Sequence, residues 1–394
     1  MRRLLLLALI AVPLASCPKP AKAKNVVIED LPKDPYEQAK KTLDTVYRAI
    51  EALDPEKMEA VLAPDVVAFG LGPNDFYTDR TAVIEELRRE FIPFNLRGDQ
   101  LKVFWTRPRI ALDDSGEGGW LHDLPRFQRL RDSGRDQFWS LRLTAHFIRQ
   151  GPEHYVIDAM HLSMGFPDTE LYADKADRKL LPPMDLGEGG NGKGTSELLD
   201  LTKKMLGDIG VKVDHTSDLE EVALIGTDVA DVFEGGAAFK ALVKPRLAEL
   251  KKSNAGTYAI EGNTRARLSP GGNSAWLAAT VVLTVKEGKK DKRLPPFRAL
   301  WIFEKEKGVW NLVSDHQSLG LKVEQREPVS RGDLPPQSEM KLSFKHKEAP
   351  NGFSSTGFTS DGGEPPSSEL KPARGGLGTP RIDAAPAKQR DGGT

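Results

Sequence analysis

Two stretches of this chain, Tyr155–Gly165 and Trp310–Gly320, match each other when one is shifted by 155 positions. The matched pairs are Tyr155 and Trp310, Ile157 and Leu312, His161 and His316, Ser163 and Ser318, and Gly165 and Gly320. Side chains alternate between the two faces of a strand, so this spacing predicts that the matched residues share one face. A strand that is used twice in this way predicts a duplicated domain.

The duplication extends beyond these two strands. Ala68–Leu87 matches Ala223–Leu242 at the same shift. Trp120 matches Trp276 at a shift of 156. Three matches at nearly one shift predict two copies of one fold. The stretch Gly207–Gly210 stands where the first copy has its second helix, which predicts a shorter or absent helix there.

Composition and pattern divide the chain into six segments. They are a signal peptide (1–17), a linker (18–35), a first unit (36–166), a linker rich in Gly and Pro (167–195), a second unit (196–323) and a tail rich in Pro and Gly (324–394). The tail has no Trp or Tyr. Such a segment buries too little apolar surface to offset the entropy of ordering, so we expect it to be disordered.

In each unit, helical patterns come before strand patterns. The first helix of the first unit places Leu43, Val46 and Ile50 on one side. Strand-like runs follow and continue to the end of each unit. This order predicts an α+β fold, with two domains whose N-terminal helices pack on a curved antiparallel sheet.

The N-terminus has the pattern of an export signal. Arg2 and Arg3 precede an apolar run, Leu4–Leu14, that is too short to span a bilayer. The sequence Leu-Ala-Ser-Cys that ends at Cys17 resembles the lipobox of bacterial lipoproteins. That resemblance implies lipid attachment at Cys17, and Pro18 after it implies the outer membrane of the cell envelope, with the chain facing the periplasm or the surface. The alternative is an ordinary signal peptide with an incidental cysteine.

The charge balance argues against some partners. Lys and Arg number 56 and Asp and Glu number 57, so the chain has no net field that would attract nucleic acid. Cys17 is the one cysteine in the sequence, which excludes an internal disulfide. The expected membrane contact is therefore the lipid on Cys17.

Three runs in the second unit resemble SnoaL-like domains of the nuclear transport factor 2-like superfamily. They are Gly272–Trp276, Phe297–Leu300 and Gly308–Ser318. The first unit is more divergent and shares Gly118–Trp120 and His161–Ser163. Its Arg142 matches Arg298 only if the following turn absorbs one residue. The resemblance implies cone-shaped domains with a pocket between helices and sheet, and sheet-to-sheet pairing that this chain could make internally.

His316 and His161 are the first candidate site residues. A pocket histidine at position 316 could act as a general base or acid, because its ordinary pKa lies near neutral pH. Asp315 is its neighbour, but adjacent strand residues point to opposite faces, which argues against a direct contact. The alternative is that both histidines are structural.

Four aromatic residues of the second unit are candidates for contact with an apolar ligand: Trp276, Trp301, Phe303 and Trp310. The alternative is that they belong to the core. Trp301 corresponds to His146 in the first unit, so two pockets, if both exist, would differ.

Further acidic and glycine-rich patterns predict no cofactor or metal. Asp75, Asp79, Asp228 and Asp231 precede the main helix of each unit, where they could cap it or bind a cation. Gly187–Lys193 has the glycine spacing of a phosphate-binding loop, but Gly194 stands where Ser or Thr is required. No Cys and His residues have zinc spacing, and we expect no cofactor.

Three functions remain open at this point. The first is a lipid-anchored, non-catalytic envelope protein that binds a small apolar ligand or an envelope partner. The second is an enzyme that transfers protons in the second cone, as the resemblance implies, with His316 as base and Asp315 or Asp228 in support. The third is a structural tether that works through its tail.

Overall fold

The computed structural model describes residues 34–131, 136–152, 154–165, 184–187, 192–228, 231–253, 256–287 and 290–321. The predicted signal peptide, the Cys17 lipidation site, most of both linkers and the tail lie outside these residues. No helix in the described ranges is long and apolar enough to cross a membrane.

The first unit opens with two helical elements. The helix α1 (Pro35–Glu51) begins after Asp34, whose carboxylate accepts a hydrogen bond from the N–H of Tyr36 at 2.8 Å. A 3-10 helix, η1 (Pro55–Ala60), follows it. One side of α1 packs its apolar residues into the core of this unit, as the periodicity predicted.

The helix α2 (Arg80–Arg97) covers the same unit. It begins after Asp79, which accepts a hydrogen bond from the N–H of Ala82 at 2.9 Å, so the predicted capping by this residue is confirmed. It ends at Gly98, whose φ of 69° is the left-handed conformation that glycine adopts at low cost.

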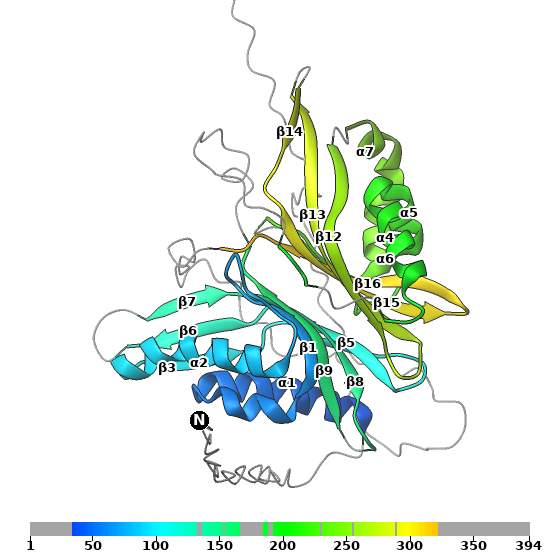
Figure 1. Cartoon of the computed structure of the whole chain (residues 1–394). Coiled ribbons are helices and arrows are strands. Elements are labelled where there is room, and N and C mark those ends of the chain that lie inside the picture. The colour runs from blue at the N-terminus through cyan, green and yellow to red at the C-terminus, as the bar shows by residue number, and fades with distance from the viewer. Residues whose placement is uncertain are drawn as a thin grey trace, which may run out of the picture. The chain divides into compact units, whose positions relative to one another are not determined.

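The first sheet has the strand order β2-β1-β9-β8-β5-β4. Its strands are β1 (Leu62–Phe69), β2 (Phe76–Tyr77), β4 (Arg109–Leu112), β5 (Gly118–Asp123), β8 (Arg142–Arg149) and β9 (Tyr155–Ser163). The β1–β9 pair is parallel and the other neighbours are antiparallel. A separate sheet has the order β3-β6-β7, with β3 (Gln100–Phe104), β6 (Arg126–Leu130) and β7 (Gln137–Ser140). Figure 1 shows α1 and α2 beside the strands of this unit.

The helices of the second unit are α4 (Ser196–Gly207), α5 (Ile209–His215), α6 (Gly236–Val243), η2 (Lys244–Arg246) and α7 (Leu247–Ser253). The prediction of a shorter or absent helix near Gly210 is wrong. The α5 helix has seven residues there, whereas η1 of the first unit has six. Asp208 caps α5 by accepting a hydrogen bond from the N–H of Gly210 at 2.7 Å, which offsets the weak helix propensity of glycine.

The second sheet repeats the strand order of the first, as β11-β10-β16-β15-β13-β12. Its strands are β10 (Ala223–Ile225), β11 (Val232–Glu234), β12 (Gly256–Leu268), β13 (Ser274–Glu287), β15 (Phe297–Glu306) and β16 (Val309–Ser318), with β14 (Lys290–Arg293) paired to β13. Here the parallel pair is β10–β16. Helices packed against largely antiparallel sheets confirm the α+β prediction, with one parallel pair in each of the two large sheets as the departure from it.

A β-bulge divides the repeated strand in both units. Between β8 and β9 the pairing skips Asp158, and between β15 and β16 it skips Val313, the equivalent position. One extra residue reverses the faces of all residues beyond it. Tyr155 and Ile157 therefore face the core of their own unit, whereas His161 and Ser163 face the other sheet. The prediction that the matched residues share one face is wrong for this reason.

The first unit breaks two strands that are continuous in the second. The long strands β12 and β13 correspond to the pairs β3/β4 and β5/β6, and prolines stand in the breaks at Pro108 and Pro125. Asp123 is the last residue of β5 and contacts both breaks. Its Oδ1 accepts hydrogen bonds from the N–H groups of Thr106 (3.2 Å), Arg107 (2.8 Å) and Leu124 (2.8 Å). The carboxylate thus replaces the ladder partners that the breaks remove.

Candidate functional site

A layer of apolar residues from both sheets lies between the units; we call it the inter-sheet layer. It consists of Val67, Phe69, Ala111, Trp120, Ala159, Leu186, Trp276, Ala278, Leu300, Ile302 and Val313. Trp276 is thus in this layer, whereas Trp301, Phe303 and Trp310 belong to the core of the second unit. The four aromatic candidates are divided between the two faces of one sheet, so they do not surround one ligand.

His161 and His316 lie against each other at the inter-sheet layer. Their rings stack with centroids 3.9 Å apart and an angle of 12° between planes. The Nε2 atom of His161 is 2.7 Å from Oγ of Ser318, and Nε2 of His316 is 2.7 Å from Oγ of Ser163. The contacts are reciprocal, as in an interface with a two-fold axis.

Both rings are fully buried, and this changes their protonation. Burial holds the pKa of each histidine well below its usual value of 6.5. His316 and Arg298 lower the pKa of His161 further, and Arg142 and Arg298 do the same for His316. A neutral, buried pair of this kind stabilises the contact between the sheets.

The two arginines make equivalent contacts across the units. Nη1 of Arg298 donates to the carbonyl oxygen of Gly72 at 2.8 Å. Arg142 donates through Nη1 to the carbonyl oxygen of Gly226 at 2.6 Å and through Nη2 to that of Asp228. Arg142 pairs with Ser163 and Arg298 with Ser318, so Arg142 is the counterpart of Arg298 and the turn does absorb one residue.

Asp315 is separated from His316. It faces the helices of the second unit, where Nζ of Lys212 donates to its Oδ2 at 2.5 Å. The enzyme hypothesis combined these two residues, and the structure places them on opposite faces of β16. Asp228 contributes its backbone carbonyl to Arg142, and the helix α6 begins at Gly235 without a side-chain cap. The predicted capping by Asp228 and Asp231 is therefore wrong.

A buried polar network, which the sequence did not predict, crosses between the units. Nδ1 of His146 is 2.6 Å from Oδ1 of Asp158, and Nε2 of His146 is 3.1 Å from Oγ of Ser274. Trp276 donates through Nε1 to Asp158 at 2.8 Å. His146 corresponds to Ile302 rather than to Trp301, because Trp120 pairs with His146 and Trp276 with Ile302.

The order Ser274, His146, Asp158 has the hydrogen-bond order of a hydrolase triad. All three side chains have 0% exposure, so no substrate reaches the hydroxyl. The Ser274 hydroxyl donates instead to Oδ2 of Asp113 at 2.7 Å. The network therefore satisfies buried polar groups across the interface and does not activate a nucleophile.

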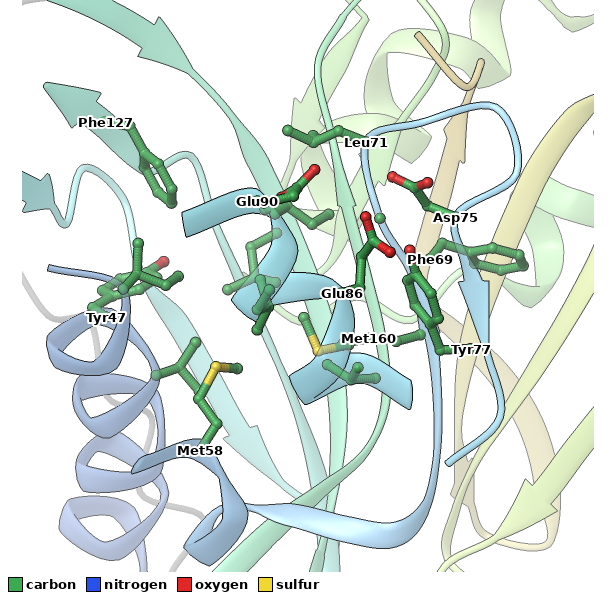
Figure 2. Close-up of a pocket in the computed structure, with 18 residues that line it drawn as sticks. Tyr47, Met58, Phe69, Leu71, Asp75, Tyr77, Glu86, Glu90, Phe127 and Met160 are labelled. Atoms are coloured by element: carbon green, nitrogen blue, oxygen red, sulfur yellow. The ribbon is translucent and has the colours of Figure 1, made fainter. Parts of the chain in front are cut away.

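A pocket lies inside the first unit, between α1, α2 and the sheet; we call it the first-unit pocket. Its volume is about 640 Å³ including solvent at its mouth. Most of its lining is apolar: Val46, Ile50, Met58, Ala68, Phe69, Leu71, Val83, Leu87, Phe127, Leu143, Met160 and Leu162. The remaining lining residues are Tyr47, Gly70, Asp75, Tyr77, Glu86 and Glu90. Figure 2 shows Tyr47 and Met58 at one end and Asp75, Glu86 and Tyr77 at the other.

The second unit has a bulkier side chain at the corresponding place in its sheet. Ala145 pairs with Met160 in the first sheet, and Trp301 pairs with Asp315 at the equivalent place in the second. Trp301 is fully buried in the core of the second unit. An indole thus stands in place of a methyl group, and the residue paired with it, Asp315, forms the ion pair with Lys212. The sequence placed most candidates for ligand contact in the second unit, whereas this pocket lies in the first.

Tyr47 lines the pocket and contacts Asp123, which is outside the lining. The Tyr47 hydroxyl donates to Oδ2 of Asp123 at 2.8 Å. Burial raises the pKa of Tyr47 well above its usual value, and the neighbouring Asp123 raises it further. Burial also raises the pKa of Asp123, although its hydrogen-bond donors oppose this. Within the described ranges, no group of three or more His, Cys, Asp or Glu residues could hold a metal ion.

Comparison with known proteins identifies the fold of this unit. Residues 39–167 match the family model of the SnoaL-like domain. The chain therefore contains a SnoaL-like domain, and the match falls on the unit that the sequence predicted to be the more divergent. No curated protein is significantly similar to the chain.

Solved structures with similarity to the chain each cover about a third of it. ActVI-ORFA from Streptomyces coelicolor is 11% identical and is matched over 33% of this chain and 97% of that chain, with a TM-score of 0.29. A protein with a cystatin-like fold from Caulobacter vibrioides is 12% identical over 34% and 93%, with a TM-score of 0.29. A protein assigned as a dehydratase of the NTF2-like family from Streptomyces avermitilis is 14% identical over 33% and 95%, with a TM-score of 0.28. Similarity at this level carries no argument about chemistry.

Proposed function

We propose that this chain, which contains a SnoaL-like domain, is a lipid-anchored protein of the bacterial cell envelope that binds a small, largely apolar ligand in the first-unit pocket. The observation that carries the proposal is the pocket itself, which combines an apolar lining with a few polar groups. Ligand sites in proteins have this composition. The lining contains no His, Lys, Ser or Cys, so binding fits its chemistry better than catalysis by such groups.

We infer that the second unit is a further copy of the SnoaL-like fold. Its sheet has the same strand order and the same bulge position, and its core is filled by Trp301 and its neighbours. A second unit with a well-packed core provides a rigid surface on which the first unit packs. Arg298 holds the carbonyl of Gly72, which lies in the loop that carries Asp75 at the mouth of the pocket.

Binding in the first-unit pocket is tested by filling it. The Met160→Trp variant should abolish the fluorescence increase of the neutral apolar probe phenylnaphthylamine, because the indole takes the space beside Leu143 and Leu162. The control is Leu96→Trp, at an exposed position on α2 that does not line the pocket. Equal probe fluorescence with the parent and with Met160→Trp would exclude this pocket as the site.

Lipid anchoring is tested at Cys17. The Cys17→Ser variant is expected to lose incorporation of labelled palmitate in a bacterial host and to move from the membrane fraction to the soluble fraction, because one thiol carries the whole anchor. Retention of the label and of membrane association would refute the anchor, and with it the proposed location, without affecting the proposal for the pocket.

A further inference from the structure

One loop of the first unit both lines the first-unit pocket and contacts the second unit. We call this loop, residues 70–75, the mouth loop; its members Gly70, Leu71 and Asp75 are among the lining residues. Figure 2 shows Leu71 and Asp75 on it. Two hydrogen bonds close the loop, from the N–H of Gly70 to the carbonyl oxygen of Asp75 at 3.0 Å and from the N–H of Asp75 to that of Gly72 at 3.2 Å. Contacts that hold the mouth loop from outside therefore also set the position of the pocket wall.

The residues that follow β16 hold this loop. We call them, Leu319–Leu321, the strap. The N–H of Leu321 donates to the carbonyl oxygen of Leu71 at 2.8 Å. Gly320 packs so closely that a Cβ atom added there would lie 2.3 Å from Cα of Pro73. Such a close approach of two backbones requires glycine, so the strap lies directly against the mouth loop.

Arg298 joins the strap, the mouth loop and the inter-sheet layer, and its side chain is buried. Besides its bond to Gly72, Nη2 of Arg298 donates to Oγ of Ser318 at 3.0 Å and to the carbonyl oxygen of Leu319 at 3.4 Å. Its guanidinium carbon lies 5.7 Å from the ring centroid of Phe69. Phe69 belongs both to the pocket lining and to the inter-sheet layer. Arg298 thus supports one lining ring and the mouth loop, although it is not a lining residue itself.

The repeat supplies a matched contact at a loop outside this pocket. Arg142 donates to the carbonyl oxygens of Gly226 and Asp228 in the loop that corresponds to the mouth loop. That loop is closed in the same way, by a hydrogen bond from the N–H of Gly226 to the carbonyl oxygen of Asp231 at 2.8 Å. None of its described residues lines the first-unit pocket. Loss of either arginine removes a buried contact between the units, but Arg298 alone of the two connects that contact to the pocket.

We propose that Arg298 and the strap are positioning elements of the ligand site, so that the second unit completes the first-unit pocket by fixing the mouth loop and Phe69. This deepens the proposed function and rests on it. Linkage is reciprocal, so a ligand that contacts Leu71 or Phe69 strengthens the hold of the strap as much as the strap strengthens ligand binding. Occupancy of the pocket is thereby coupled to the contact between the units.

The affinity of phenylnaphthylamine, measured by fluorescence titration of the full chain, tests the positioning role. Arg298→Ala should weaken binding by at least about fivefold, and Arg298→Lys should recover part of the loss, because lysine can still donate to Gly72. Gly320→Ala should also weaken binding, since it keeps every hydrogen-bonding group but pushes the strap away from the mouth loop. The matched control, Arg142→Ala, should lower the urea midpoint as much as Arg298→Ala but change the affinity less than about twofold.

Hydrogen exchange tests the reverse direction of the coupling and needs no variant. Saturating phenylnaphthylamine should slow exchange of the Leu321 amide at least about fivefold more than that of the Gly226 amide, which closes the counterpart loop. A ligand that only stabilised the whole chain would slow both amides alike.

The outcomes separate this inference from the proposed function. If the parent does not bind the probe, or if Met160→Trp binds it as the parent does, the pocket is not the site and both proposals fail. If the parent binds the probe but Arg298→Ala and Arg142→Ala lose affinity equally, or neither loses any, the positioning role is wrong and the pocket remains. Equal slowing at Leu321 and Gly226 would refute that role in the same way, even if Arg298→Ala does not fold.

Discussion

Acidification from about pH 7.5 to about pH 5.5 is expected to lower the free energy of unfolding by about 3 kcal/mol through His161 and His316 alone. Burial keeps the pKa of both rings well below the unfolded value of 6.5. Below pH 6.5 the unfolded chain therefore binds two protons that the folded chain excludes, and stability falls as the pH falls. Above pH 6.5 both states are neutral at these residues, and this contribution vanishes.

The charges around the pair explain why the folded state cannot accept those protons. Arg142 and Arg298 approach from the two sheets, and His122 also lowers the pKa of His316. Burial lowers the pKa of Arg142 to about 10, which leaves it charged throughout this pH range. A protonated histidine would meet a second ring at 3.9 Å and two guanidinium groups with little water to screen them.

Denaturant unfolding of the parent and of a His161→Gln, His316→Gln double variant at both pH values measures this effect. Glutamine keeps a polar group for each serine and does not titrate in this range, so the variant should lose the extra acid sensitivity even if it is less stable overall. In the parent, nuclear magnetic resonance should show two histidines that do not titrate between these pH values. Normal titration of both rings near pH 6.5 would contradict the predicted coupling.

The repeated strand predicted two units with one order of elements, and the two sheets have that order. The period-two argument failed at the bulge, because the extra residue at Asp158 is matched by one at Val313. An insertion that both copies carry leaves their alignment unchanged. The sequence match therefore agrees with the common strand order of the two sheets but could not show which way His161 and His316 point.

The polar network and the pocket depend on contacts that local sequence does not reveal. His146 and Ser274 are far apart in the chain and meet only because the sheets pack together. Ala145 in the first unit corresponds to Trp301 in the second, and this is the main difference between the two cores. The sequence match at a shift of 155 did not reveal the correspondence, because these two residues align at a shift of 156. One signal was available: Pro108 and Pro125 interrupt strands that are continuous in the second copy.

Removal of the carboxylate at Asp123 is expected to destabilise the chain by about 3 to 5 kcal/mol, because the Asp123→Ala variant leaves two buried donors, of Tyr47 and Thr106, and two partly buried donors, of Arg107 and Leu124, without their acceptor. The second unit has Ala279 at the equivalent position and needs no such acceptor, since β13 continues through it. The expected loss is thus a consequence of the strand breaks.

Asp123→Asn distinguishes the loss of an acceptor from the loss of a charge. An amide can place its oxygen at the position of Oδ1, where it accepts the three N–H groups, and its NH₂ toward the Tyr47 hydroxyl oxygen. We therefore expect this variant to lose only about 1 kcal/mol. If both variants lose the same several kcal/mol, the negative charge itself stabilises the breaks.

The surface control is Asp114→Ala, at an exposed position, which should change stability by less than about 0.5 kcal/mol. Urea unfolding of the three variants gives these differences directly. An Asp123→Ala variant as stable as the parent would show that water replaces the carboxylate at the breaks. Since the breaks separate β6 from β5 and bring Phe127 to the pocket, the loss of Asp123 should also weaken binding of phenylnaphthylamine. Asp123, which stabilises the breaks in the strands, is thereby predicted to keep the first-unit pocket open.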